Sequence, residues 1–241
     1  LGKTPAIFNF STGVRNVADT ASNAGVKTVL TSRTFIEKAN LAEMVTQLAL
    51  SNRIIYLEDL AATVSLMDKL QGLFKFWRGS GGKSTSESRL ILFTSGTEGR
   101  PKGVVLSQRN LVSGAYSVAH YLRLRADDVI LGVLPLSFDA GFSQLTTALV
   151  SGACYAPLDF LQANEVPTFC EAHGVTVITG VPPLWMQLAS VQWPQPAGAR
   201  IRCFANTGGH MPPPLLEKLK TAFPNALPYL MYGLTEAFRS T

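Results

Sequence analysis

The sequence predicts an α/β protein in which layered, largely parallel sheets are flanked by helices. Short apolar segments alternate with longer amphipathic segments along the 241 residues, which is typical of strands linked by helical crossovers. Apolar segments also lead directly into the glycine-containing turns at Thr94 and Tyr232. A chain of this length can bury a sizeable core.

The strands are expected where apolar residues run together, and the helices where they recur every three or four positions. The expected strands are residues 6–10, 27–31, 54–57, 89–93, 102–106, 129–134, 153–158, 175–179, 200–205 and 227–231. The expected helices are residues 13–24, 33–49, 66–78, 107–121, 140–150, 164–173, 182–190 and 213–222. The last of these begins at three consecutive prolines, which pre-set the backbone of a first turn.

Composition predicts two α/β subdomains, a partial one over residues 1–78 and a second over residues 89–241, incomplete at its C-terminus. Between them, GSGGKSTSES (79–88) is typical of a flexible connector. Its GGKST sequence ends like a Walker A loop, but the required first glycine falls on Trp77. The chain begins without methionine and ends next to a motif, so we expect a fragment.

Charge is unevenly distributed along the chain. The net charge is +5, from 21 basic and 16 acidic residues. Eight basic but only two acidic residues lie between Lys69 and Arg109, which favours an anionic partner there. No zinc pattern, basic helix or aromatic-rich strand motif accompanies them, so nucleic acid is not an expected partner.

The cysteines and the apolar segments indicate a cytoplasmic location. Cys154, Cys170 and Cys203 are odd in number and lack CxxC spacing, which predicts neither a disulfide framework nor a metal site and suits a reducing compartment. No signal peptide is visible. The longest apolar stretch, residues 129–161, is interrupted by prolines and polar residues and is no membrane span.

Residues 66–78 form an amphipathic helical pattern with two interpretations. An apolar stripe that includes Leu70 and Trp77 is accompanied by Lys69, Lys75 and Arg78. Such a helix either packs on its own domain or rests on a membrane surface as a peripheral contact.

The segment TSGTEGRPKG (94–103) predicts a phosphate-binding loop. Its three glycines allow several backbone N–H groups to point into one concavity, its hydroxyls add donors, and Lys102 adds a compact positive charge. The loop is not a Walker A motif, because Pro101 occupies the second glycine position and a strand follows Lys102. An ordinary loop rich in Gly, Ser and Thr is the alternative.

A second motif, MYGLTE, occupies residues 231–236. Its aromatic ring could face a nucleobase, and the Glu236 carboxylate is the ligand type that a phosphate-bound Mg²⁺ takes. By itself, the segment is also compatible with a strand-end turn capped by a threonine.

In this order, the two motifs resemble those of the adenylate-forming (AMP-binding) superfamily, over nearly the whole chain. Two further turns, 135–139 and 206–210, fall where that family places its carboxylate-side and adenine-side loops. Residues 26–41, 54–59 and Glu98 look like acyl-carrier-protein synthetases. Residues 134–153, 181–189 and 231–241 look closer to exosortase-associated acyl-CoA ligases.

The resemblance implies part of the N-terminal domain of an adenylate-forming enzyme, with residues 89–241 as the ATP-binding subdomain. The residues implied to bind the β- and γ-phosphates are Thr94, Ser95, Gly96, Thr97, Gly99 and Lys102. Those implied around the adenine are Gly208, Gly209, Tyr232 and Gly233. Thr235 would contact the α-phosphate and Glu236 would hold Mg²⁺, and with Lys102 they form the implied catalytic set.

The implied reaction is AMP-forming ligation of a carboxylic acid, expected to be a fatty acid, to coenzyme A or to a phosphopantetheinyl acyl-carrier protein. Backbone donors, a lysine and a metal would offset the charge of the reacting phosphates. Implied substrate contacts are Phe138, Asp139 and Trp185. Asp139 would bind a substrate ammonium or cap a helix. An amino-acid-activating domain and an inactive nucleotide-binding fragment remain the alternatives, and the fragment alone is expected to be weakly active.

Overall fold

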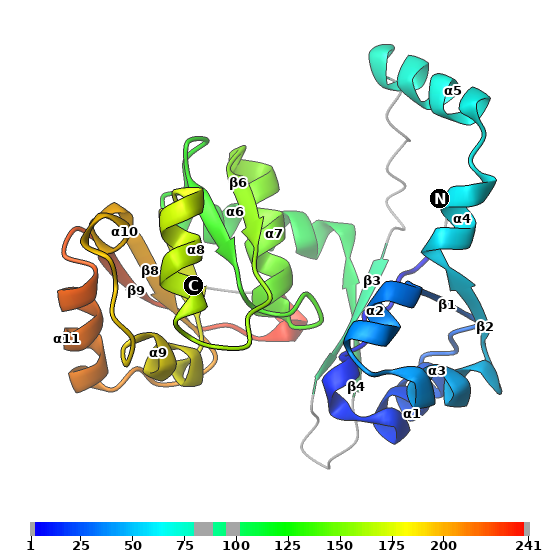
Figure 1. Ribbon diagram of the computed structural model, residues 1–241, viewed down its shortest axis with the longest axis horizontal. Helices are drawn as coiled ribbons and strands as arrows, with labels where there is room; N and C mark the ends of the chain where they lie inside the picture. Colours follow the sequence, from blue (N-terminus) through cyan, green and yellow to red (C-terminus); the bar gives the residue numbers. More distant parts are fainter. Residues whose placement is uncertain (1–2, 80–88, 95–101, 239–241) are drawn as a thin grey trace. The chain divides into compact units, whose positions relative to one another are not determined.

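The computed structural model describes residues 3–79, 89–94 and 102–238 (Figure 1). The chain divides into two compact units, Leu1–Val105 and Leu106–Thr241. Apart from Gly79, the expected connector over residues 79–88 lies outside the described residues, and the subdomain division drawn there stays a prediction.

The first unit packs helices on a short parallel sheet. Its elements are η1 (Phe10–Thr12), α1 (Val14–Asn23), β1 (Thr28–Thr31), α2 (Arg33–Lys38), α3 (Ala42–Ala49), β2 (Arg53–Tyr56), α4 (Leu57–Thr63), α5 (Leu66–Trp77), β3 (Arg89–Thr94) and most of β4 (Lys102–Ser107). Strands β1 and β2 pair in parallel, and β3 pairs with β4. The core joins Val17 and Ala21 of α1 to Met44 and Leu48 of α3, because these apolar residues recur on one face of each helix.

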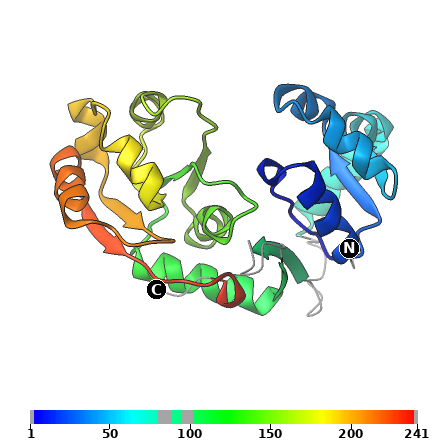
Figure 2. The same ribbon diagram turned by 90° about the horizontal axis from the view of Figure 1, so that it is seen from below.

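The second unit is built on a five-stranded parallel sheet, which Figure 2 shows from below. Its elements after β4 are α6 (Gln108–Tyr121), β5 (Val129–Gly132), α7 (Asp139–Ser151), β6 (Cys154–Pro157), α8 (Glu165–His173), β7 (Val177–Gly180), α9 (Pro182–Leu188), α10 (Gln195–Arg200), β8 (Cys203–Asn206), α11 (Pro213–Ala222), β9 (Leu227–Leu230) and η2 (Thr235–Ala237). The strand order is β6-β5-β7-β8-β9, and every neighbouring pair is parallel.

Alternate strand residues divide the core of this unit into two layers. Leu131, Ile178 and Phe204 pack with α8, α9 and α11 on one face of the sheet. Their neighbours Ile130 and Val177 pack with α6 and α7 on the other face. Because successive side chains of a strand point to opposite faces, near-continuous apolar strands give a sheet that is covered on both sides. The predicted α/β class with largely parallel sheets is confirmed.

Several expected elements differ from the structure. Residues 6–10 are not a strand, since only Ala6 forms a bridge, with Ile91, and Phe10 begins a 3₁₀ turn. The single helix expected over 33–49 is two helices, α2 and α3, because the chain turns at Asn40, where φ is +52°. Helices α4 and α10 were not expected.

A buried ion pair ties the strands together at the amino edge of the sheet. Arg202 donates to both carboxylate oxygens of Asp128, from Nε at 2.6 Å, and Thr176 Oγ1 donates to the same carboxylate at 2.9 Å. Burial raises the pKa of Asp128, but these hydrogen bonds and one from the Arg125 N–H outweigh it and leave that pKa below its ordinary value. In the described part of the chain, no helix is long and apolar enough to cross a membrane.

Candidate functional site

The strand order places a topological switch point in the second unit. Strand β6 lies on one side of β5, whereas β7 lies on its other side. In open parallel sheets of this type, ligands bind beyond the carboxyl ends of the strands at such a point. The candidate residues Phe138 and Asp139 follow β5, and Trp185 follows β7. The candidates of the two glycine-containing turns follow β8 and β9: Gly208, Gly209, Tyr232, Gly233, Thr235 and Glu236. The topology therefore brings all of these to one edge of the sheet.

The Gln144 side chain bridges the backbone after β5 and the backbone of β7 at the switch point. The β5–β7 ladder ends after two residue pairs, whereas the ladders of β5–β6, β7–β8 and β8–β9 each run for four. The buried Gln144 side chain of α7 takes over at that point: its Oε1 accepts from the Leu134 N–H at 3.2 Å, and its Nε2 donates to the Thr179 carbonyl oxygen at 2.9 Å. Both backbone groups are thus satisfied while the strands diverge.

The turn after β8 exposes Gly208 and Gly209, whereas Asn206 and Thr207 just before them are buried. Asn206 Nδ2 donates to the Gly209 carbonyl oxygen at 2.8 Å, and the Thr207 N–H donates to the Gly180 carbonyl oxygen at 3.0 Å. Gly208 has a φ of +72°, a conformation that favours glycine. A Cβ at Gly209 would lie 3.1 Å from Pro182 Cγ, so the turn fits closely against the start of α9.

The segment after β9 presents Tyr232 and Glu236 to solvent and is anchored beyond them. Tyr232 is 70% exposed, and Glu236 is also exposed. Phe238 is fully buried, and its backbone fits against Gly114 of α6, where an added Cβ would lie 2.1 Å from the Phe238 carbonyl oxygen. Sequence reasoning missed this contact. The signal for it was a glycine inside a helical pattern.

The start of α7 carries the expected substrate contacts after β5. Phe138 is the N-cap residue and Asp139 is the first helical residue, so the expectation that Asp139 caps the helix is corrected by one position. Phe138 is exposed and Asp139 is half-buried. A carboxylate in the first turn interacts favourably with the helix dipole. This gives Asp139 a structural role besides any contact with a ligand.

Trp185 lies in the core beneath the same edge. It is fully buried, its ring meets Phe204 edge to face with centroids 5.8 Å apart, and a Cβ at Gly180 would lie 2.8 Å from its Cε2. No described group partners its Nε1. Its expected contact with substrate stays a prediction, and in this structure the side chain is covered by protein.

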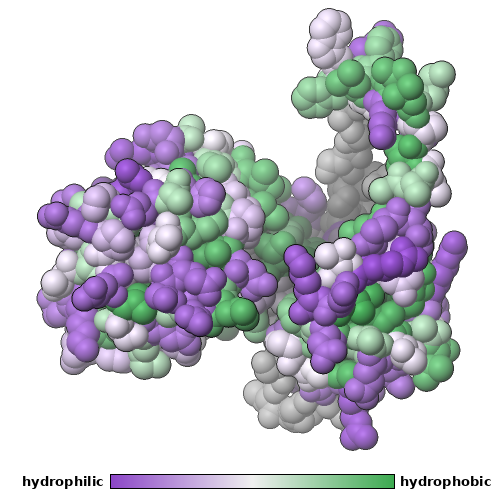
Figure 3. Space-filling model, in the orientation of Figure 1, coloured by the Kyte–Doolittle hydropathy of each residue, from purple (hydrophilic) through white to green (hydrophobic). Residues whose placement is uncertain are grey.

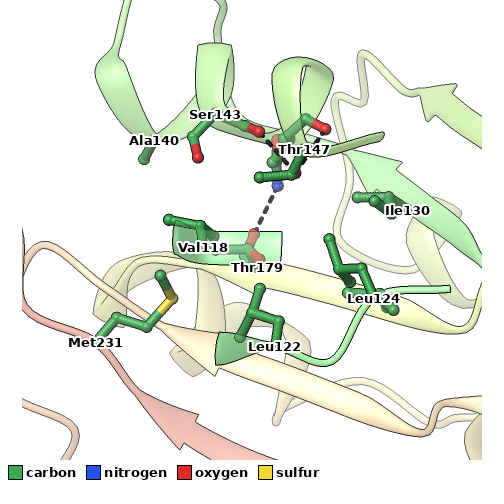
Figure 4. A pocket seen from close by; sticks show the side chains of 11 residues that line it. Val118, Leu122, Leu124, Ile130, Ala140, Ser143, Thr147, Thr179 and Met231 are labelled. Carbon is green, nitrogen blue, oxygen red and sulfur yellow. Dashed lines mark hydrogen bonds between the residues drawn. The ribbon is translucent and has the colours of Figure 1, made fainter. Parts of the chain in front are cut away.

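Figure 4 shows a small cavity between the sheet and the two helices that cover one of its faces. Val118, Ala140 and Thr179 are among the residues that line it, and it measures about 10 Å³. That volume suits about one water molecule and no acyl chain.

The phosphate-loop candidates belong to the first unit. Thr94 ends β3 and Lys102 begins β4, and these two strands pair. A Cβ at Gly103 would lie 3.1 Å from Phe93 Cε1, so the residues next to Thr94 and Lys102 lie side by side. Lys102 is exposed. Ser95, Gly96, Thr97, Gly99 and the neighbouring Glu98 lie outside the described residues.

The groups present at the carboxyl edge of the second unit fit a nucleotide. The exposed Tyr232 ring offers a flat face to a base, and the neighbouring strand β8 ends in the exposed glycine turn. The buried Asn206 Oδ1 has no partner among the described atoms and can accept a hydrogen bond. The exposed Glu236 supplies a carboxylate oxygen of the type that Mg²⁺ takes.

The fold is that of a doubly wound α/β protein, and the candidate residues of its second unit meet at the carboxyl edge of the sheet. More specifically, the chain belongs to the AMP-binding enzyme family, which it matches over residues 2–240. It is 31% identical over 160 residues to the chloroplastic/peroxisomal 2-succinylbenzoate–CoA ligase of Arabidopsis thaliana, an alignment that covers 65% of this chain and 29% of the relative.

Two solved structures share the fold. The inhibitor-bound N-terminal domain of FACL13 from Mycobacterium tuberculosis has a TM-score of 0.78 at 21% identity, covering 97% of this chain and 57% of its own. The o-succinylbenzoate coenzyme A synthetase of Bacillus subtilis, in complex with ATP and magnesium ion, has a TM-score of 0.77 at 22% identity, covering 98% and 46%. The chain thus spans under a third of the curated relative and about half of each solved chain.

Proposed function

We propose that the chain forms part of an AMP-forming acid–thiol ligase. In this reaction, ATP converts a carboxylic acid to an acyl-adenylate, and the acyl group then passes to the thiol of coenzyme A. The observation that carries the proposal is the meeting of four strand-end segments, after β5, β7, β8 and β9, at one edge of the sheet beside its switch point. Family membership and the coenzyme A ligase named among the relatives support it.

The nucleoside is assigned to the turns after β8 and β9. Tyr232 would stack on the adenine, and the Gly208–Gly209 turn would lie along its edge, where a larger side chain would obstruct a base. The unpartnered Asn206 Oδ1 suits an amino group, which is a donor.

Thr235 and Glu236 are assigned to the reacting end of ATP. The acid's carboxylate oxygen would attack the α-phosphorus, the new phosphorus–oxygen bond would form as the bond to pyrophosphate breaks, and pyrophosphate would leave. The Thr235 hydroxyl would donate to an α-phosphate oxygen, and Glu236 would hold a magnesium ion. Magnesium offsets the negative charge of the phosphates. Thr94, Ser95, Gly96, Thr97, Gly99 and Lys102 are assigned to the β- and γ-phosphates on their sequence pattern.

The acid is proposed to be apolar, as in a fatty acid, and carrier-bound phosphopantetheine is a further candidate acceptor. The segment after β7 is rich in apolar side chains, from the half-buried Val181 to Leu184 and Trp185 in the core. An acid site lined by side chains of this kind would favour an alkyl chain over a charged side chain. Phe138, exposed at the start of α7, would contact the acid near its carboxylate.

The test is pyrophosphate exchange by the full-length protein with a panel of carboxylic acids. The panel includes fatty acids of increasing length, aryl acids and amino acids. We expect labelled pyrophosphate to enter ATP only when an acid is present, and AMP to be the product when a thiol acceptor is added. Formation of ADP would overturn the proposal, and exchange with amino acids alone would favour the amino-acid-activating alternative.

A further inference from the structure

Helix α5 exposes an apolar stripe that no described residue covers. None of its residues is buried, and Leu66, Phe76 and Trp77 are 74%, 82% and 87% exposed. Figure 3 shows green, hydrophobic residues gathered over α5. Stable monomers rarely leave a whole helix face of this kind in water, so the stripe indicates an interaction surface.

The stripe lies on one side of a well-capped helix. Leu66, Leu70, Leu73 and Trp77 are spaced four, three and four residues apart, which aligns them along the axis. Ser65 and Asp68 form a capping box, in which the Asp68 carboxylate accepts from the Ser65 N–H at 2.9 Å and from its hydroxyl at 2.6 Å. These interactions stabilise the first turn independently of any packing partner.

The basic side chains on and next to α5 form no ion pair with the residues that the structure describes. Lys69, Lys75 and Arg78 have no acidic partner within ion-pairing distance in the part of the chain that the structure describes. The one acidic residue of the helix, Asp68, is engaged in the capping box. The Arg78 guanidinium lies over the Phe74 ring, 5.3 Å from its centroid, so positive charge borders the apolar face.

We propose that α5 is a peripheral membrane-binding element that lies in the surface of a bilayer containing anionic lipids. Its apolar stripe enters the boundary between headgroups and acyl chains, and Trp77 takes the interfacial position that tryptophan prefers. Lys69 and Arg78 flank the stripe, extend their apolar stems along that surface and place their charged groups among the lipid phosphates. Lys75, on the opposite face of the helix, adds to the attraction toward anionic lipids. A protein partner would need both a matching apolar groove and acidic groups on its rim, whereas an anionic bilayer supplies both together.

The experiment is vesicle co-sedimentation of the full chain. The vesicles contain phosphatidylcholine alone or mixed with phosphatidylglycerol. We expect binding to the mixed vesicles and at least about tenfold weaker binding to phosphatidylcholine alone. Brominated lipids should quench the exposed Trp77 on binding, while the fully buried Trp185 keeps its emission.

Two double variants, each with a matched control, distinguish membrane binding through α5 from the nonspecific electrostatic attraction of a basic chain. Leu70→Gln with Trp77→Gln should weaken binding at least about tenfold without changing charge. The control, Leu149→Gln with Leu161→Gln, alters residues that are 72% and 98% exposed elsewhere and should bind as wild type. Lys69→Gln with Lys75→Gln should weaken binding to mixed vesicles roughly tenfold or more. Its control, Lys38→Gln with Lys218→Gln, should have a much smaller effect.

Three outcomes would overturn the proposal. One is no binding of the wild-type chain to mixed vesicles. Another is binding that the α5 variants and their controls reduce equally, which would reflect net charge alone. The third is concentration-dependent self-association that the Leu70 and Trp77 substitutions abolish while lipid binding is absent, which would assign the stripe to a second copy of the chain.

Discussion

The rings of Phe142 and Phe238 meet edge to face with their centroids 5.9 Å apart. This contact joins the segment after β9, which carries Glu236, to the first turns of α7, which begin at Asp139. Phe238 is fully buried, so it anchors the end of an otherwise exposed segment. The proposed metal ligand and the proposed acid-binding helix are thereby held together by the packing of these two rings.

Gly114→Ala should disturb this anchor. An alanine Cβ would lie 2.1 Å from the Phe238 carbonyl oxygen, so the Glu236 segment would have to shift by about 1 Å. We expect the acid-dependent exchange rate to fall about a hundredfold. Gly72→Ala is the control, because nothing lies within 4 Å of the added methyl group. Wild-type exchange by the Gly114 variant would show that the anchor does not position the site.

Gln144→Leu should destabilise the second unit. The substitution leaves the Leu134 N–H and the Thr179 carbonyl without the partner that spans the switch point. We expect the free energy of unfolding in urea to fall by about 3 kcal/mol. The exposed Gln187 of α9 provides the control, and Gln187→Leu should change it by less than about 0.5 kcal/mol. Equal effects of the two variants would contradict the bridging role.

Asp128→Asn should also lower stability, and in a pH-dependent way. The change leaves Arg202 without its charge partner and should cost about 3 kcal/mol at neutral pH, whereas Asp127→Asn alters an exposed neighbour and should cost little. Because the folded-state pKa of Asp128 lies below its ordinary value of 3.8, its contribution is fully present above that value. The contribution is lost as the pH falls through the folded-state pKa. Urea unfolding at several pH values should show a constant difference down to about pH 4 and a shrinking one below it.

The strands of the parallel sheet are the elements that the sequence predicts best. All five strands of the parallel sheet were expected, because their apolar runs are short and bounded by turns. Asn40 was not recognised as a helix end, because asparagine only sometimes adopts a positive φ. Residues 6–10 have the composition of a strand but bond to β3 only around Ile91, and a short apolar run does not reveal its partner.

The sequence predicts the four turns of the candidate site but not the contacts that hold them in place. The sequence indicates glycines, an aromatic ring and carboxylates after strands, and parallel pairing then requires them to share an edge. The contacts that hold the edge were not visible, because Gln144, Gly114 and Phe238 act on partners distant in sequence. Trp185 was expected to face substrate, yet its apolar character serves the core equally well.

Acid-dependent pyrophosphate exchange by Glu236→Gln, measured over a range of magnesium concentrations, tests whether the segment after β9 holds the metal of an AMP-forming ligase. Glutamine keeps the shape of the side chain but removes the charge that is proposed to hold the metal. Glu217→Gln, at an exposed glutamate of α11, is the matched control. We predict that the Glu236 variant loses at least about tenfold in exchange at low magnesium and partly recovers as magnesium rises, while the control matches wild type. Exchange by the Glu236 variant that equals wild type at every magnesium concentration would show that Glu236 does not hold the metal.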